Sequence, residues 1–245
     1  MLIFTMKKRS LILLVLLVIA IVVTFAIVGS VIALASGQGE SSFAIRNADV
    51  ETQTVALTFN TTSLGEMVEI MQILDRFDVP ATFFITGIFK ENYPEAVAQL
   101  IQAGHEIGTM GENNLRMDLL DREQFMREVQ GKVENIQYAS GQETVLVRPP
   151  FGEYNQETLA NADYLDLMMV MYSLDSRCRS ATTGHQITQR VVNHAQAGDI
   201  IRFDTTSGQA LLDSLPMMLI HLQGNGFDFQ TAGAMLNPVV DVVVD

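Results

Sequence analysis

Short apolar runs alternate with helical patterns along most of the chain. Residues 54–59 form the first run that is rich in strand-forming side chains. The apolar positions after it recur at the spacing of one helix face, at Met67, Ile70, Leu74 and Phe77. The same alternation predicts further strands at residues 81–85, around Ile107, and at residues 144–147, 167–171, 199–203 and 227–231.

The predicted helices carry recognisable start signals. Pro94 suits the first turn of a helix, where its missing N–H has no partner to lose. Asp121 with Gln124 resembles a capping box at the start of the next helix. Pro216 interrupts the last long apolar pattern, and because proline cannot donate inside a helix, we expect it to mark the first turn there.

About seven strand–helix units follow one another, which predicts a single α/β domain, either a parallel barrel or a doubly wound sheet. In both folds the loops after the carboxyl ends of the strands carry the chemistry. We expect this domain to cover residues 54–236, with a linker at residues 36–53 and a short tail at residues 237–245.

The N-terminal segment has a different character. Residues 11–35 contain no charged side chain and follow a basic flank at residues 1–10. About 20 apolar residues cross a bilayer, and a basic flank stays in the cytoplasm, so we expect a membrane anchor with the domain outside the cytoplasm. A signal peptide cleaved after Ala35, which would release a secreted domain, is the competing interpretation, although usual apolar regions of signal peptides span only about 7–15 residues.

Charge and composition exclude several classes of function. The chain has 15 Lys and Arg against 28 Asp and Glu; without the three basic residues of the first 35, the remainder carries 12 against 28, a net charge of −16. Nucleic acid is not an expected partner, because binding it needs a basic face. The single cysteine, Cys178, excludes an internal disulfide and a multi-cysteine metal site, and four histidines leave little for a His-rich one.

Five short segments then follow in one order. They read V-A-L-T-F-N at residues 55–60, P-A-T-F-F at 80–84, G-H-E-I-G at 104–108, R-P-P-F-G at 148–152 and G-D-I-I at 198–201. Together they resemble the polysaccharide deacetylases with a NodB homology domain (carbohydrate esterase family 4), and residues 61–65 are most similar to the sporulation-type members. The resemblance runs from about residue 55 to residue 236 and implies an irregular (β/α)7-type barrel.

The resemblance also implies a chemistry. Members of the family remove acetyl groups from N-acetylglucosamine or N-acetylmuramic acid units of peptidoglycan and chitin-like polymers by hydrolysing a C–N bond. An Asp and two His hold a divalent metal, usually zinc, which polarises the amide and activates water. A second Asp is the general base, and a late His is the general acid.

This chain departs from the family at every one of those positions. The base position is Asn60 and the acid position is Asp204, while the metal-ligand positions are Thr61, Met110 and Asn114. An amide does not take up a proton near neutral pH, and a thioether is a poor zinc ligand. A new site built from Glu112, Asp204 and Asn114 is the alternative, but its two carboxylates and one amide would suit magnesium or calcium better than zinc. We therefore expect no metal cofactor, and none of the histidines stands at a ligand position: His105, His185, His194 and His221.

The framework around these positions persists better. Arg148 matches the arginine that orients the base in the family, and Asp175 matches the aspartate that steadies the acid. Two interpretations of this pair stay open: a buried ion pair that serves only the fold, or two side chains that orient a ligand. The expected binding pocket adds to them Asn60, Phe151, Tyr154 and Asp204.

The sequence thus predicts a membrane-anchored protein of the cell envelope that has lost metal-dependent deacetylation and keeps a glycan-binding or structural role. Expected partners are peptidoglycan or another cell-wall glycan, and the membrane through the N-terminal helix. One alternative is a divergent hydrolase of N-acetylated sugars, with Asp204 as the acid–base group and Arg148 as the electrophile. Another is a protein-interaction module whose acidic surface docks a partner.

Overall fold

The computed structural model describes residues 43–140 and 146–236. The predicted anchor at residues 11–35 and the predicted tail at residues 237–245 lie outside the described residues. Within the two described ranges, no helix combines the length and hydropathy needed to cross a membrane.

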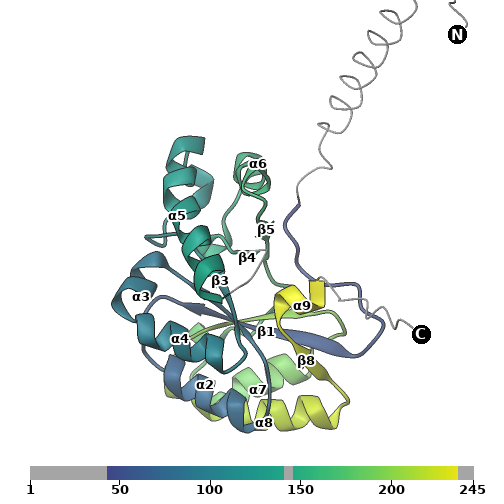
Figure 1. Cartoon of the computed structure of the whole chain (residues 1–245). Helices are drawn as coiled ribbons and strands as arrows, with labels where there is room; N and C mark the ends of the chain where they lie inside the picture. The colour runs from purple at the N-terminus through teal and green to yellow at the C-terminus, as the bar shows by residue number, and fades with distance from the viewer. Residues whose placement is uncertain (1–42, 141–145, 237–245) are drawn as a thin grey trace, which may run out of the picture. The chain divides into compact units, whose positions relative to one another are not determined.

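A sheet of parallel strands organises the domain (Figure 1). Seven strands pair in the order β5-β4-β3-β2-β1-β7-β6, and β8 pairs with the beginning of β1. This α/β half-barrel agrees with the barrel that the alternating pattern and the family resemblance predict. The strands are β1 (Thr54–Thr61), β2 (Thr82–Ile85), β3 (Glu106–Thr109), β4 (Leu146–Val147), β5 (Met168–Met169), β6 (Leu174–Asp175), β7 (Ile200–Asp204) and β8 (Asp228–Gln230).

Most helices cover one face of this sheet, and α9 packs on the other. In Figure 1, α2, α7 and α8 lie together on one side of β1, and α9 lies on the other side. The helices are α2 (Met67–Arg76), α3 (Gly87–Asn92), α4 (Pro94–Gln102), α5 (Arg122–Ser140), α6 (Gln156–Tyr164), α7 (Gly184–Val192), α8 (Gln209–Gly224) and α9 (Ala232–Leu236). Three short 3-10 turns complete the described elements: η1 (Met117–Leu119), η2 (Pro150–Gly152) and η3 (Cys178–Ser180).

The two faces of the sheet belong to two separate apolar clusters, because successive side chains of a strand point to opposite faces. On β1, Leu57 and Phe59 join the large cluster that the outer helices complete. Ala56 faces the other way, into a smaller cluster that we call the inner cluster. Its buried members are Ala48, Ala56, Phe84, Met110, Leu146, Val170, Ile200, Ala232 and Met235.

Two helix starts agree with the sequence and one does not. Pro94 is the first residue of α4. Asp121 and Gln124 form the predicted capping box, each side chain accepting from the other's backbone N–H. The prediction for Pro216 is wrong, since α8 begins at Gln209 and the proline lies inside it. Burial of one apolar face of α8 outweighs the hydrogen bond that an interior proline removes.

Part of the predicted linker also belongs to the sheet. Ile45 forms a parallel bridge with Val170, and Asn47 forms an antiparallel bridge with Asp199. The ordered domain therefore includes residues before Thr54, and the segment around Ile45 covers the edge of the sheet next to β5.

Candidate functional site

Two strand ends bring the predicted base and acid positions together. Asn60 near the end of β1 is the register partner of Asp204 at the end of β7. Paired residues on neighbouring parallel strands point to the same face, so both side chains lie at the carboxyl edge of the sheet. This edge is where α/β folds bind ligands.

Arg148, immediately after β4, reaches across the inner face to this edge and is fully buried. Its Nη1 donates to Thr58 Oγ1 at 2.9 Å and to Asn60 Oδ1 at 3.1 Å. It also donates to two backbone carbonyls, from Nε to Val170 O at 3.0 Å and from Nη2 to Met171 O at 2.8 Å. The guanidinium also lies 3.9 Å above the ring of Phe84. Four neutral acceptors and one aromatic face therefore surround this cation.

The charge of Arg148 is therefore poorly compensated. Burial, helped by the neighbouring cation of Arg202, lowers the pKa of Arg148 to about 9. Among the described residues, no carboxylate lies within ion-pair distance of its guanidinium. The side chain still carries its charge at neutral pH, and Asn60 offers it only an amide oxygen.

Asp175 pairs with a different arginine. Arg202 donates from Nη1 to Asp175 Oδ2 at 3.3 Å and to the hydroxyl of Tyr172 at 3.2 Å. Burial opposes the charge of Arg202, but Tyr172 and Asp175 outweigh it and raise the pKa of the guanidinium. The expected alternative of a buried ion pair between Arg148 and Asp175 is thus wrong, because Arg202 lies on the intervening strand β7 and takes the carboxylate.

Asp204 is held in place by its own loop. Thr206 donates to Asp204 Oδ1 from its hydroxyl at 2.6 Å and from its backbone N–H at 3.3 Å. Arg179 Nη1 lies 3.6 Å from Oδ2. Cys178 contacts the same loop: its Sγ accepts from the Asp204 N–H at 3.3 Å and from the Ser207 hydroxyl at 3.0 Å. These contacts fix the orientation of the Asp204 side chain.

The three ligand positions do not converge on a polar centre. Met110 is buried in the inner cluster among apolar side chains. Thr61 is fully buried at the end of β1, and its hydroxyl has no hydrogen-bond partner among residues 43–140 and 146–236. Asn114 is partly exposed and has a left-handed backbone with φ of 56°.

The two predicted aromatic residues differ in how they are presented. Phe151, three residues after Arg148, is 62% exposed, and its φ of 63° is unusual for a side chain of this size. Tyr154 packs partly against the large cluster, and its hydroxyl accepts from Arg46 at 3.3 Å. Of these two aromatic side chains, Phe151 is the more exposed and is available to a ligand.

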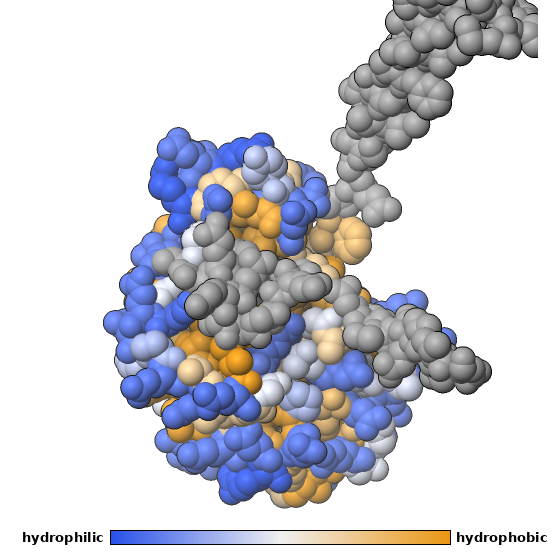
Figure 2. Space-filling model, viewed as in Figure 1, coloured by the Kyte–Doolittle hydropathy of each residue, from blue (hydrophilic) through white to orange (hydrophobic). Residues whose placement is uncertain are grey.

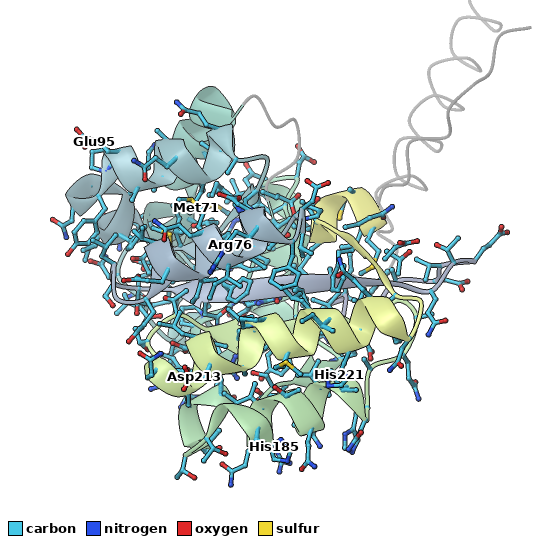
Figure 3. The ribbon with its side chains drawn as sticks, turned by 90° about the horizontal axis from the view of Figure 1, so that it is seen from below. Met71, Arg76, Glu95, His185, Asp213 and His221 are labelled. Carbon is cyan, nitrogen blue, oxygen red and sulfur yellow. The ribbon has the colours of Figure 1, made fainter. Side chains whose placement is uncertain are left out.

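The histidines lie away from this edge. His105 is buried at the beginning of β3, where its Nδ1 accepts from Ala81 N–H at 3.2 Å. His185 on α7 and His221 on α8 are exposed on the outer helices (Figure 3). His194 is exposed beyond the end of α7, with its Nδ1 2.8 Å from the carbonyl of Arg190.

The sequence of this domain matches a known family. The sequence profile of the polysaccharide deacetylase family matches residues 47–170, just over half of the chain. The chain belongs to the polysaccharide deacetylase family. A relative among characterised proteins is the peptidoglycan-N-acetylglucosamine deacetylase of Bacillus cereus, which is 26% identical over 185 residues, 74% of this chain and 67% of that protein.

Solved structures share the deacetylase fold. A protein described as a CE4 family pseudoenzyme from Bacillus anthracis superimposes with a TM-score of 0.74 at 23% identity, covering 80% of this chain and 70% of that one. PdaA of Bacillus subtilis, described as a family 4 carbohydrate esterase, superimposes with a TM-score of 0.71 at 20% identity, covering 78% and 84%. At these identities the similarity shows the fold.

The zinc ion that the family resemblance implies does not fit the side chains present here. A hydroxyl, a thioether and an amide replace one carboxylate and two imidazoles, and zinc in proteins is held by Cys, His, Asp and Glu. In addition, Met110 is 1% exposed and packs among apolar side chains of the inner cluster, so its sulfur is not placed beside polar ligands. Within the described ranges, no group of three His, Cys, Asp or Glu side chains is placed to hold a metal ion.

Part of the polar network around Asp175 and Asp204 was not predicted from the sequence. Arg202, Tyr172, Arg179 and Thr206 make the contacts that hold Asp175 and Asp204, and none of them was predicted as a site residue. Arg202 had a usable signal, because a charged residue inside the apolar run 199–203 must find partners when that strand is buried. Tyr172 and Thr206 stand in loops and have no such signal.

Proposed function

We propose that this deacetylase-family protein binds a cell-wall glycan at the carboxyl edge of its barrel and has lost metal-dependent N-deacetylation. The observation that carries the proposal is that the side chains at the catalytic positions are replaced while the surrounding carboxyl edge of the sheet is kept. The amide of Asn60 takes the place of a base, while Arg148 and Phe151 keep their positions.

Exposed apolar side chains along this edge support the binding role. Ile88, Leu115, Leu119 and Phe151 are all exposed and follow β2, β3 and β4. Their loops are connected, since Ile88 N–H donates to Glu112 O at 3.3 Å and Asn155 Nδ2 donates to Asp118 O at 2.8 Å. In the view of Figure 2, apolar side chains also gather between α5 and α6, while polar side chains cover most of α3 and α4. Apolar patches of this kind mark binding surfaces, and pyranose rings present apolar C–H faces.

The loss of catalysis follows from the combination of substitutions. Deacetylation needs a base, an acid and a metal that act as a unit, and removing one member of such a unit already removes most of the rate. Asn60 cannot accept the proton, and Met110 lies in apolar packing. Asp204 stands at the position of the acid, and its two carboxyl oxygens are engaged by the Thr206 hydroxyl and by Arg179.

The place of action that we propose is the outer side of the cytoplasmic membrane. The charge-free run at residues 11–35 and the basic flank before it support a membrane anchor. Protease digestion of intact and of opened cells checks this orientation, because an external domain is cut in both samples. Protection in intact cells would contradict it.

The function itself is tested by measuring three quantities on the purified chain: metal content, acetate release from N-acetylchitohexaose and peptidoglycan, and binding of the same glycans. We expect no stoichiometric zinc, no turnover, and saturable binding that Phe151→Ala weakens about tenfold, since burying an aromatic ring contributes about 1–2 kcal/mol. Steady acetate release that Asp204→Asn abolishes would instead establish the divergent hydrolase. Absence of glycan binding with a fully folded chain would contradict the proposal.

A further inference from the structure

A pocket lies where α2, α3 and α4 meet. It has a volume of about 400 Å³ and lies between the beginning of α2 and the junction of α3 with α4. We call it the outer pocket, and the residues used below are Leu64, Val68, Asn92, Tyr93, Glu95 and Gln99. We infer that the outer pocket is a second carbohydrate-binding site that takes an uncharged pyranose unit.

The outer pocket presents an anchored aromatic ring. Tyr93 is 37% exposed in the short connection between α3 and α4. Its ring lies 5.2 Å from that of the buried Phe89, and its backbone N–H donates to Phe89 O at 2.9 Å. A half-exposed ring that is fixed from behind loses little conformational freedom when a ligand covers it, which favours stacking on an apolar sugar face.

The rest of the lining matches the other groups of a sugar. Leu64 and Val68 supply apolar surface, and the exposed side-chain amides of Asn92 and Gln99 supply both donors and acceptors for hydroxyl groups. Small-molecule sites combine apolar walls with a few polar groups in this way. A protein partner would need a larger apolar area than these side chains provide.

Charge limits which sugar can bind. Glu95 is the one charged side chain among those that line the outer pocket, and it lies at the outer margin of the molecule (Figure 3). Because no cation lines the outer pocket, a phosphate or a uronic acid would find a carboxylate and no counter-charge. This excludes an anionic sugar. Because Glu95 stands at the margin and the other lining side chains are uncharged, the interior of the outer pocket fits an uncharged unit, as in an N-acetylated glucan.

The outer pocket is connected through one loop to the proposed glycan site around Asn60, Arg148 and Phe151, which we call the inner site. Leu64 stands four residues after Asn60, and Asn60 O accepts from Thr205 N–H at 3.0 Å on the opposite side of the edge. A glycan chain that occupies both places would gain affinity from the high effective concentration of the second unit. The inference thus extends the proposed glycan-binding function, but it concerns other residues.

The test is a titration of the full-length chain in detergent with N-acetylchitohexaose. We expect Tyr93→Ala to weaken binding about three- to tenfold and Tyr93→Phe to retain it, because stacking needs the ring and not the hydroxyl. Ile220→Ala is the control, since Ile220 is an exposed apolar side chain on the outer helix α8 and lies outside the outer pocket. Circular dichroism and the melting temperature check that each variant is folded.

Each outcome is decisive. Unchanged affinity of folded Tyr93→Ala overturns the inference, and if Phe151→Ala weakens binding in the same series, the proposed function stands without it. Weaker binding by Tyr93→Ala with no effect of Phe151→Ala keeps the outer pocket and rejects the inner site as a glycan site. Crosslinking in the native envelope tests a protein partner. If Tyr93→Ala loses a crosslinked protein while its glycan affinity is unchanged, the outer pocket docks a protein, and the inference is overturned.

Discussion

At the scale of single residues, the surroundings of Arg148 determine how the site behaves. A buried guanidinium is costly unless it is both hydrogen-bonded and paired with a charge, and here it is only hydrogen-bonded. The lowered pKa of Arg148, about 9, expresses that cost. One side chain, Asn60, stands where a carboxylate would complete the pair.

Asn60→Asp is therefore expected to stabilise the fold. A hydrogen bond between charged partners contributes about 1.5–3 kcal/mol, and part of this is offset by dehydration of the new carboxylate, so we expect a gain of about 1 kcal/mol in the free energy of unfolding at pH 7. Arg148 lowers the pKa of the new carboxyl in the folded state. The gain is thus present above the unfolded pKa and is lost as the pH falls through the folded pKa.

Urea unfolding at pH 7 and at pH 3 measures this difference between Asn60→Asp and the wild type. Asn60→Ala, which leaves Arg148 without the amide oxygen, is the control and is expected to lose about 1 kcal/mol. A stability gain of Asn60→Asp that persists unchanged at pH 3 would argue against an ion pair as its cause.

Phe151 combines an exposed ring with a left-handed backbone, and the two can be separated by substitution. A left-handed backbone costs a bulky residue about 1–2 kcal/mol, and glycine removes that cost while increasing the entropy of the unfolded chain by about 0.5–1 kcal/mol. Phe151→Gly should therefore unfold at the same or slightly higher urea concentration and should lose glycan affinity. Phe151→Ala, which keeps the strain and removes the ring, separates the two effects. A clear loss of stability in Phe151→Gly would show that the ring serves packing.

At the scale of elements, α8 shows how tertiary packing overrides a local signal. An interior proline costs about 3 kcal/mol in a helix relative to alanine, whereas it lowers the entropy of the unfolded chain by about 1 kcal/mol. We expect Pro216→Ala to raise the free energy of unfolding by about 1–2 kcal/mol. Pro94→Ala is the control, because Pro94 stands at the first position of α4, where proline is compatible with the helix and its replacement should lower stability slightly. Equal effects of the two substitutions in urea unfolding would contradict this account.

The elements also show which features could be predicted from the sequence. The capping box at Asp121 and the long strand β1 have strong local signals, and both were predicted. The two-residue strand β6 and the short helix α3 have almost none, because such short elements are defined by pairing and packing with distant residues. In the site, motif alignment located Asn60 and Arg148, but the partner of Asp175 depends on the register of β6 with β7. No local pattern encodes that register.

At the scale of the whole molecule, the net charge of −16 after residue 35 distinguishes two kinds of partner. Stacking on exposed aromatic rings involves no net charge, whereas a basic protein would be drawn to the acidic surface and released by salt. Raising the salt concentration from about 0.1 M to about 1 M shortens the Debye length from about 10 Å to about 3 Å. We expect the affinity for N-acetylchitohexaose to change less than about twofold over this range, as measured by titration calorimetry. Uncharged maltohexaose serves as the control for unspecific sugar binding, and a tenfold loss of chitohexaose affinity with salt would favour an electrostatic docking surface over the glycan-binding function.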